Sequence, residues 1–252
     1  MDILIHTYGR ATLPQQHTLQ SLLSADILPT LVIQHREINL YGWYKGPIHV
    51  LPPHLQTLSP TRDYLIHDKS WKDDQVVFFD DDLHFFVRRK DDRTKFAAPT
   101  ADDLRRMVDS IAAQLAVQPH VGIAPREGGN RNTKDSLLNT RIMRVLGYRR
   151  SYLREKNITF TPLVVMEDFH VNLQVLESGA DTLLLNNWCS NQAGGSDAPG
   201  GCSTYRTSAV QSTAAHQLAL LHPAYVRVVQ KATKTAWGGG TRDDVIIQWK
   251  KA

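Results

Sequence analysis

A chain of 252 residues with 42% hydrophobic and 21% charged residues has the ordinary composition of a single globular domain, and its two cysteines exclude a disulfide scaffold. No apolar run approaches the ~20 residues that span a bilayer, and the N-terminus lacks a signal-peptide pattern, so we expect a cytoplasmic protein without a membrane partner. The formal net charge of +4 is compatible with a polyanionic partner such as nucleic acid.

The first half of the chain alternates short apolar runs with amphipathic segments. Residues 14–23 predict a helix that starts near a proline, and Thr100 caps another helix that runs to about Val117. A third helix is predicted at residues 59–66, with Pro60 in its first position. Strands are predicted at residues 3–5, 30–34, 48–51, 75–79, 83–87 and 120–124. This alternation predicts an α/β fold with a mostly parallel central sheet, in which ligands bind beyond the carboxyl ends of the strands.

The second half of the chain is less regular. Apolar runs predict strands at residues 163–166, 182–186, 225–229 and 245–249, and helices at residues 167–177 and 209–221. Polar stretches that contain glycine predict loops at residues 126–135, 187–204 and 237–244. A loop as long as residues 187–204 is usually functional or mobile, so this segment is a candidate part of a site.

Three adjacent aspartates, Asp80, Asp81 and Asp82, follow the strongest strand signal of the chain, at residues 75–79. Carboxylates crowded at a strand end repel one another unless a counter-charge is present. A divalent cation such as Mg²⁺, which takes one or two carboxylates together with phosphate oxygens and water, supplies that charge. Since side chains alternate along a strand, we expect Asp80 and Asp82 to point to the same side and to share one metal ion. The alternative is a solvated turn, because aspartate is common in turns.

These aspartates, the loop at residues 7–10, the helix start at residues 59–62 and the pair Glu167 and Asp168 together resemble the GT-A superfamily of nucleotide-sugar glycosyltransferases. With its segment at residues 165–171 and its length, the chain is most similar to the bacteriophage TET-associated glycosyltransferases. The resemblance implies that the acceptor is a 5-hydroxymethylpyrimidine in DNA.

The resemblance also implies a fold and a donor. We expect one GT-A-like domain over residues 1–252, an α/β/α sandwich, with a nucleotide-sugar-binding half (1–125) and an acceptor-binding half (126–252). The expected donor is a UDP-sugar, bound together with Mn²⁺ or Mg²⁺.

Several residues are assigned to the donor site by the same resemblance. They are Thr7, Tyr8 and Arg10 beside the nucleotide base, Asp80 or Asp81 at the ribose, Asp82 at the metal, and Arg62 near the donor. His35 and Arg36, which follow the second predicted strand, are candidates for the base pocket. Each of these residues has an alternative interpretation as a polar surface side chain.

Direct displacement at the anomeric carbon needs a base that takes the acceptor proton. The position of Asp168 fits that base, with Glu167 holding the sugar hydroxyls. The alternative is that Asp168 caps the helix that follows it. His216 and His222 are candidate metal ligands, since GT-A enzymes often use a late histidine, although lone histidines are more often structural.

Four further side chains are candidates for phosphate or acceptor contacts. Arg242 follows three glycines, whose backbone amides can approach a phosphate; the alternative is a tight hairpin with a solvated arginine. Arg126 and Arg131 could bind donor or DNA from their polar loop. Trp188 could stack on a sugar or an extruded base, or could anchor its loop to the core.

The predicted function is a metal-dependent, inverting transfer of a sugar to the hydroxymethyl group of 5-hydroxymethylcytosine in phage DNA. The alternatives are a GT-A enzyme with another acceptor, a nucleotidyltransferase, a non-catalytic metal-dependent DNA-binding protein and a metal-dependent nuclease. A nucleotidyltransferase is disfavoured because residues 7–10 lack a basic, glycine-rich loop. Helix-turn-helix and zinc-finger patterns are absent from the sequence, which disfavours simple DNA binding.

Overall fold

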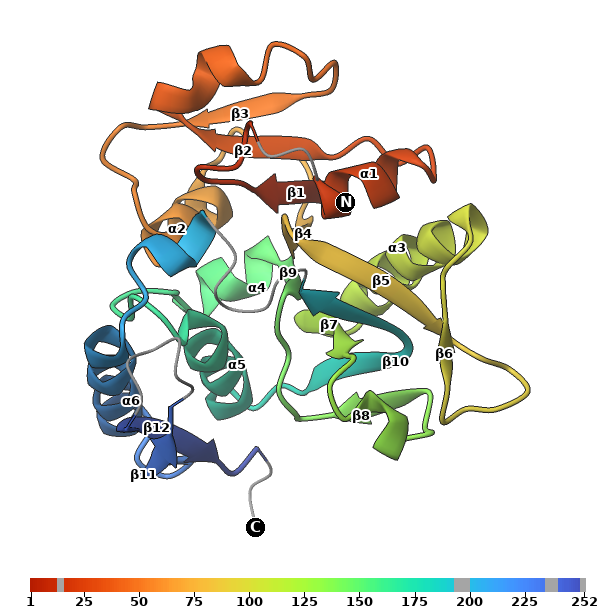
Figure 1. Cartoon of the computed structure of the whole chain (residues 1–252). Helices are drawn as coiled ribbons and strands as arrows, with labels where there is room; N and C mark the ends of the chain where they lie inside the picture. Colours follow the sequence, from red (N-terminus) through yellow and green to blue (C-terminus); the bar gives the residue numbers. More distant parts are fainter. Residues whose placement is uncertain (13–15, 193–199, 234–239, 250–252) are drawn as a thin grey trace.

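The computed structural model describes residues 1–12, 16–192, 200–233 and 240–249 and centres on one large mixed sheet (Figure 1). The strand order is β3-β2-β1-β4-β9-β7-β10-β5-β6, with β8 paired to β10. Within the described residues, β5, β8 and β9 run against the direction shared by the other strands of this sheet. The sheet is therefore mixed but mostly parallel, as predicted.

The strands of this sheet are short. They are β1 (Asp2–His6), β2 (Thr30–Gln34), β3 (Ile48–Leu51), β4 (Gln75–Asp80), β5 (Leu83–Arg88), β6 (Phe96–Ala97), β7 (His120–Pro125), β8 (Ser136–Leu138), β9 (Val145–Arg149) and β10 (Thr182–Gln192). The flanking helices are α1 (His17–Leu23), α2 (Leu58–His67), α3 (Ala101–Leu115), α4 (Arg150–Glu155) and α5 (Glu167–Glu177).

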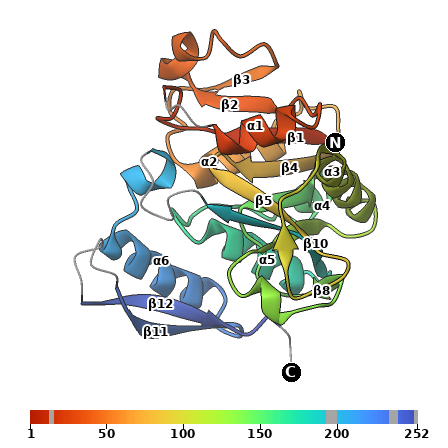
Figure 2. The ribbon, with the colours of Figure 1, turned by 45° about the vertical axis from the view of Figure 1, so that its right-hand side comes forward.

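Alternation along the strands divides the core into two apolar layers, one on each face of the sheet. In β4, Val77 and Phe79 belong to the layer that contains side chains of α1 and α3. Val76 and Phe78 point to the opposite layer, which contains side chains of α2, α4 and α5. Helices thus cover both faces of the sheet, which confirms the predicted α/β/α sandwich (Figure 2).

The last part of the chain forms a smaller unit on the outer side of α5, which we call the C-terminal unit. It consists of α6 (Ser208–Leu221), β11 (Val226–Ala232), β12 (Thr241–Ile247) and the residues as far as Trp249. Figure 2 shows α6 lying along the antiparallel β11–β12 pair. Leu173 of α5, Leu218 of α6 and Val245 of β12 share a third apolar cluster that holds this unit on the sandwich. Among the described helices, none is long and apolar enough to cross a membrane.

Most predicted elements of the first half are confirmed with small shifts. Residues 30–34 and 48–51 are β2 and β3 with the predicted bounds. Thr100 caps α3 in a reciprocal capping box: its hydroxyl accepts the Asp103 N–H (3.2 Å), and Asp103 accepts the Thr100 N–H (2.9 Å). Pro60 is the third residue of α2, not the first.

The second half shows larger differences from the prediction. Residues 163–166 form no strand; Leu163 and Val165 are instead buried in the third cluster, whose packing explains their apolar character. Residues 187–192 continue β10 instead of forming a loop, because residues 188–192 pair with β5. The pairing of β10 with β7 shifts register between Leu185 and Cys189. Thr241 begins β12 inside the predicted glycine-rich loop.

Some predictions fall on residues outside the described ranges. These are Pro14 of the first helix, residues 193–199 of the long loop, and residues 237–239 of the glycine-rich loop. Strand β9, which lies between β4 and β7 and completes the centre of the sheet, is not predicted from the sequence. Its Gly147 interrupts the apolar pattern, because a Cβ there would lie 2.9 Å from the Val121 carbonyl oxygen and 3.1 Å from side-chain atoms of α3.

Candidate functional site

A cavity of about 730 Å³ opens at the carboxyl ends of β1 and β4. Its lining comes from the loop after β1, from α2, from the turn after β4, from the start of α5 and from the C-terminal unit. The structure brings together in this lining ten of the predicted site residues: Thr7, Tyr8, Arg10, Arg62, Asp80, Asp81, Asp82, Glu167, Asp168 and Arg242. The site therefore lies where parallel-sheet topology predicts a ligand.

The loop after β1 is held from behind by the 3₁₀ helix η1 (His35–Leu40). Thr7 and Tyr41 share a hydrogen bond between their hydroxyl groups (2.9 Å). The Gly9 N–H donates to the buried carboxylate of Glu37 (2.7 Å), and Gly9 has φ +67°, a conformation that favours glycine. These contacts fix the loop that carries Tyr8 and Arg10 into the cavity.

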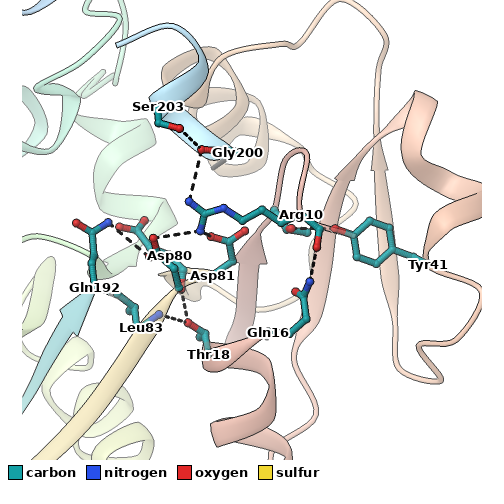
Figure 3. Close-up of polar contacts among 12 residues, drawn as sticks. Arg10, Gln16, Thr18, Tyr41, Asp80, Asp81, Leu83, Gln192, Gly200 and Ser203 are labelled. Carbon is teal, nitrogen blue, oxygen red and sulfur yellow. Dashed lines mark hydrogen bonds and ion pairs between the residues drawn. The ribbon is translucent and has the colours of Figure 1, made fainter. Parts of the chain in front are cut away.

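Arg10 is the direct partner of two of the three aspartates, Asp81 and Asp82, and Figure 3 shows its contact with Asp81. Its Nη1 forms an ion pair with Asp81 and lies 3.1 Å from Oδ2 of Asp82. Burial raises the pKa of Asp81 to about 7, although the attraction of Arg10 opposes that shift. Arg10 therefore supplies part of the counter-charge that the crowded carboxylates need.

The turn after β4 differs from the expected extension of the strand. The strand ends at Asp80, so the alternation argument for Asp80 and Asp82 is wrong: both line the cavity because the chain turns there. Thr18 stabilises the turn, since its hydroxyl donates to the Asp80 carbonyl oxygen (2.6 Å) and accepts the Leu83 N–H (2.9 Å). A backbone turn stabilised by hydrogen bonds from α1 thus aims the carboxylates at the cavity.

Arg62 joins the aspartate cluster to the start of α5. Its side chain is only 2% exposed, its Nη1 lies 2.8 Å from Oε1 of Glu167, and its Nη2 lies 3.4 Å from Oδ1 of Asp80. Burial raises the pKa of Glu167 to about 7 and that of Asp80 to about 6, against the attraction of Arg62. One buried guanidinium therefore holds two carboxylates that are far apart in the sequence.

Asp168 lies in the first turn of α5 and lines the cavity. The N-cap of α5 is Met166, which has φ +67° and no capping side-chain hydrogen bond, so the capping interpretation of Asp168 is wrong. A carboxylate in the first turn of a helix is stabilised by the helix dipole. The Asp168 carboxylate therefore faces any molecule that is bound in the cavity.

The side-chain atoms that could coordinate a metal ion here are carboxylate oxygens. Asp80 and Asp82 both line the cavity, and hard cations such as Mg²⁺ or Mn²⁺ take one or two such ligands with phosphate oxygens and water. Within the ranges that the structure describes, no group of three or more His, Cys, Asp or Glu side chains is arranged to hold a metal. Asp80 and Asp82 could therefore hold a cation only if its remaining ligands came from a bound molecule or from water.

The two predicted histidine ligands lie outside the cavity lining. His216 is exposed on α6 and pairs with Asp243 (2.8 Å). His222 is buried, and its ring nitrogens bond to Glu177 (2.8 Å) and to His170 (2.7 Å). Both histidines already have partners in the C-terminal unit and in α5, so the structure does not bring them to the aspartates.

Five other predicted residues also lie outside the cavity lining. His35 and Arg36 belong to η1, and the guanidinium of Arg36 stacks 4.8 Å from the ring centre of Tyr8. Trp188 is buried in β10, where its Nε1 donates to the Asp103 carbonyl oxygen (2.9 Å), so it anchors the core. Arg126 stacks on Phe86 at 4.4 Å, and Arg131 is exposed in the 3₁₀ helix η2 (Gly129–Arg131).

The sequence did not single out several residues that line the cavity. His6 ends β1, and neither nitrogen of its ring has a hydrogen-bond partner in the described part of the chain. Burial lowers the pKa of His6 well below its usual value, and the nearby Arg62 lowers it further, so its ring is neutral. Its position at the carboxyl end of a predicted strand is the signal that could have identified it. Arg141, Arg206, Lys231 and Trp249 had no such signal.

Comparison with known proteins gave one family match. A family model described as TET-Associated Glycosyltransferase matches residues 1–201. A search of curated proteins found no match. Two solved structures are similar: CMP:2-keto-3-deoxy-manno-octonic acid synthetase complexed with CTP (TM-score 0.46, 11% identity, 73% of this chain and 88% of that chain), and 4-diphosphocytidyl-2C-methyl-D-erythritolsynthase from Anaerococcus prevotii (0.43, 12%, 74% and 90%). The family match includes the aspartate cluster and the start of α5, and it ends before α6.

Proposed function

Because the chain belongs to the TET-associated glycosyltransferase family and is thus a glycosyltransferase, we propose that it moves a sugar from a UDP-sugar to 5-hydroxymethylcytosine in DNA. The proposed reaction depends on Mn²⁺ or Mg²⁺ and inverts the configuration at the anomeric carbon of the sugar. The observation that supports it best is the convergence of Asp80, Asp82, Glu167 and Asp168 on one cavity, with Arg62 joining the two pairs.

The donor half of the reaction is assigned to the aspartate side of the cavity. Asp80 and Asp82 would hold the cation, which when bound neutralises the charge of the leaving UDP. Thr7 and Tyr8 would contact the nucleotide, because the loop that carries them lines the cavity beside the aspartates. Arg10 keeps Asp81 and Asp82 in place, and Arg242 is a further candidate for a phosphate contact.

The transfer step is assigned to the start of α5. The hydroxymethyl oxygen attacks the anomeric carbon, a new carbon–oxygen bond forms, and the bond between that carbon and the diphosphate oxygen breaks. Asp168 accepts the proton of the attacking hydroxyl. Glu167, held by Arg62 at 2.8 Å, would accept hydrogen bonds from the sugar. Fixed carboxylates of this kind lower the barrier by positioning the reacting groups.

The experiment that tests this function is a transfer assay on defined DNA. The purified protein is incubated with Mn²⁺, a panel of UDP-sugars and oligonucleotides that contain 5-hydroxymethylcytosine, and the nucleosides are then analysed by mass spectrometry. We expect a mass gain of one sugar on the hydroxymethylated nucleoside and none on matched cytosine oligonucleotides. Release of UDP without any modified nucleoside would keep the glycosyltransferase but discard the DNA acceptor. DNA nicking in Mg²⁺ without a donor would instead indicate a nuclease.

A further inference from the structure

One wall of the cavity is built by the C-terminal unit, which lies beyond the segment that matches the family model. Lys231 of β11, Arg242 and Asp244 of β12, and Trp249 after β12 all line the cavity that also contains Asp168. This wall completes the site from the side opposite to the loop after β1. None of the assigned donor or catalytic roles uses Lys231 or Trp249.

Two aromatic rings and a guanidinium are in contact at this wall. Trp249 meets Phe169 edge to face, with ring centres 5.8 Å apart and an angle of 66° between the planes. The guanidinium of Arg141 lies over the same phenylalanine, 4.5 Å from its ring centre. Phe169 directly follows Asp168 in α5, and all four residues line the cavity. An aromatic surface is thus placed beside Asp168, the proposed catalytic base.

The charge of this wall is positive, in contrast to the aspartate side. Lys231 and Arg242 both pair with the carboxylate of Asp244, at 3.4 Å and 3.2 Å. The Lys231 side chain is 48% exposed. Arg141 is exposed, and it forms no ion pair with any residue in the described ranges. Exposed cations next to exposed aromatic surface are typical of sites for single-stranded nucleic acid.

Building on the function proposed above, we propose that this wall binds the acceptor nucleotide: the pyrimidine stacks against Trp249 and Arg141, and Lys231 contacts a neighbouring phosphate. A base within a duplex must leave the stack before an enzyme can reach it, and it then needs a flat surface to replace its neighbours. Trp249 and Arg141 offer that surface beside Phe169, so the hydroxymethyl group would face Asp168. Trp188, Arg126 and Arg131 lie outside the cavity lining and cannot take this role.

The first test replaces the aromatic part of the wall. With a single-stranded oligonucleotide that contains 5-hydroxymethylcytosine, we expect Trp249→Ala to raise the KM for DNA by about tenfold or more, since base–aromatic stacking is worth ~1–3 kcal/mol. Trp249→Phe should retain most of the affinity. The control is Trp43→Ala, because Trp43 is 48% exposed and lies outside the cavity lining. In this control, both the KM for DNA and the slow hydrolysis of the UDP-sugar without DNA, which reports on the donor site, should stay within about twofold of the unmodified protein.

The second test measures the phosphate contact. The affinity for DNA falls as the salt concentration rises. We expect Lys231→Ala to make the negative slope of log affinity against log salt shallower by about 0.7, the value for one phosphate contact on a single strand. The control is Lys156→Ala, because Lys156 is exposed and also pairs with a carboxylate, that of Glu155 at 3.0 Å. Suppose that the unmodified protein transfers sugar to DNA, but that Trp249→Ala leaves the KM for DNA unchanged and Lys231→Ala leaves the salt slope unchanged. That result would overturn this inference and leave the proposed function standing. Absence of transfer to any hydroxymethylated DNA would overturn the proposed function, and this inference with it.

Discussion

The two sides of the cavity use charge in opposite ways. On the aspartate side, Asp81 and Asp82 pair with Arg10, while Asp80 and Glu167 pair with Arg62, and both arginines are buried. On the C-terminal wall, Lys231 and Arg141 are exposed and Trp249 is partly exposed. Buried ion pairs fix their side chains in one geometry, as the transfer of a small sugar requires. Exposed cations leave a surface that can follow a long and flexible anion.

The largest effect on activity is expected from replacing Asp82, a proposed metal ligand on the aspartate side. Asp82→Ala should reduce both sugar transfer and donor hydrolysis by at least about 10³-fold, because the leaving diphosphate loses its counter-charge. Activity is measured as UDP release over a range of Mn²⁺ concentrations. Asp102→Ala, on the exposed face of α3, is the control. Full activity of Asp82→Ala would remove the metal site from this turn.

A second substitution separates chemistry from donor binding. Asp168→Asn should lower kcat for transfer by about 10²–10⁴-fold while the Kd of the UDP-sugar stays nearly the same, because the amide cannot accept the acceptor proton. Calorimetry with the UDP-sugar and single-turnover transfer measure the two quantities. Wild-type transfer by this variant would move the base to another residue.

The buried ion pairs should also contribute to the stability of the fold. Arg62→Met leaves Glu167 and Asp80 buried without their guanidinium, so we expect the free energy of unfolding to fall by about 3–5 kcal/mol. Urea denaturation measures the loss. Adding Glu167→Gln to this variant should recover part of it, because an uncompensated carboxylate is then removed. A loss below about 1 kcal/mol would mean that Arg62 does not compensate these charges.

The smallest effect concerns a buried histidine far from both walls. His120 is fully buried and stacks on Tyr148 at 4.3 Å, and burial lowers its pKa to about 4. Between pH 6.5 and 4 the unfolded chain therefore binds a proton that the folded chain does not, so the free energy of unfolding falls as the pH falls.

Replacing this histidine tests the pH dependence directly. In His120→Gln the slope of unfolding free energy against pH should be shallower by up to about 1.4 kcal/mol per pH unit within this window. Urea denaturation at several pH values measures it, with the exposed His67→Gln as the control. Parallel pH curves for His120→Gln and the unmodified protein would contradict the assignment.

The strand, the acidic turn and the carboxylates of α5 could be predicted because each leaves a local pattern. Residues 76–79 are a continuous apolar run buried on both faces, and Asp80 follows it directly. Asp168 was identified by its resemblance to a family pattern. Patterns of this kind can be recognised in the sequence because they are formed by residues that are adjacent in the chain.

The remaining parts of the site depend on contacts between distant segments. The pairing of Arg10 with Asp81 spans 71 positions and that of Arg62 with Glu167 spans 105, so neither has a signature in the sequence. The sequence predicts a loop at the end of β10, because the polar residues there become strand only through pairing with β5. The edge-to-face contact of Trp249 with Phe169 likewise forms only after the C-terminal unit packs on α5.

The separate interior of the C-terminal unit has a consequence for how such enzymes can be altered. Its apolar cluster shares no residue with the two clusters of the sheet, and α5 divides them: Val171 and Val175 face the sheet, while Phe169 and Leu173 face the unit. A chimera in which another sequence replaces the segment after η4 (Gly201–Thr204) would therefore keep the interior of the sandwich intact. With the acceptor role proposed for the C-terminal wall, such grafts would combine one sugar chemistry with a choice of target polymers.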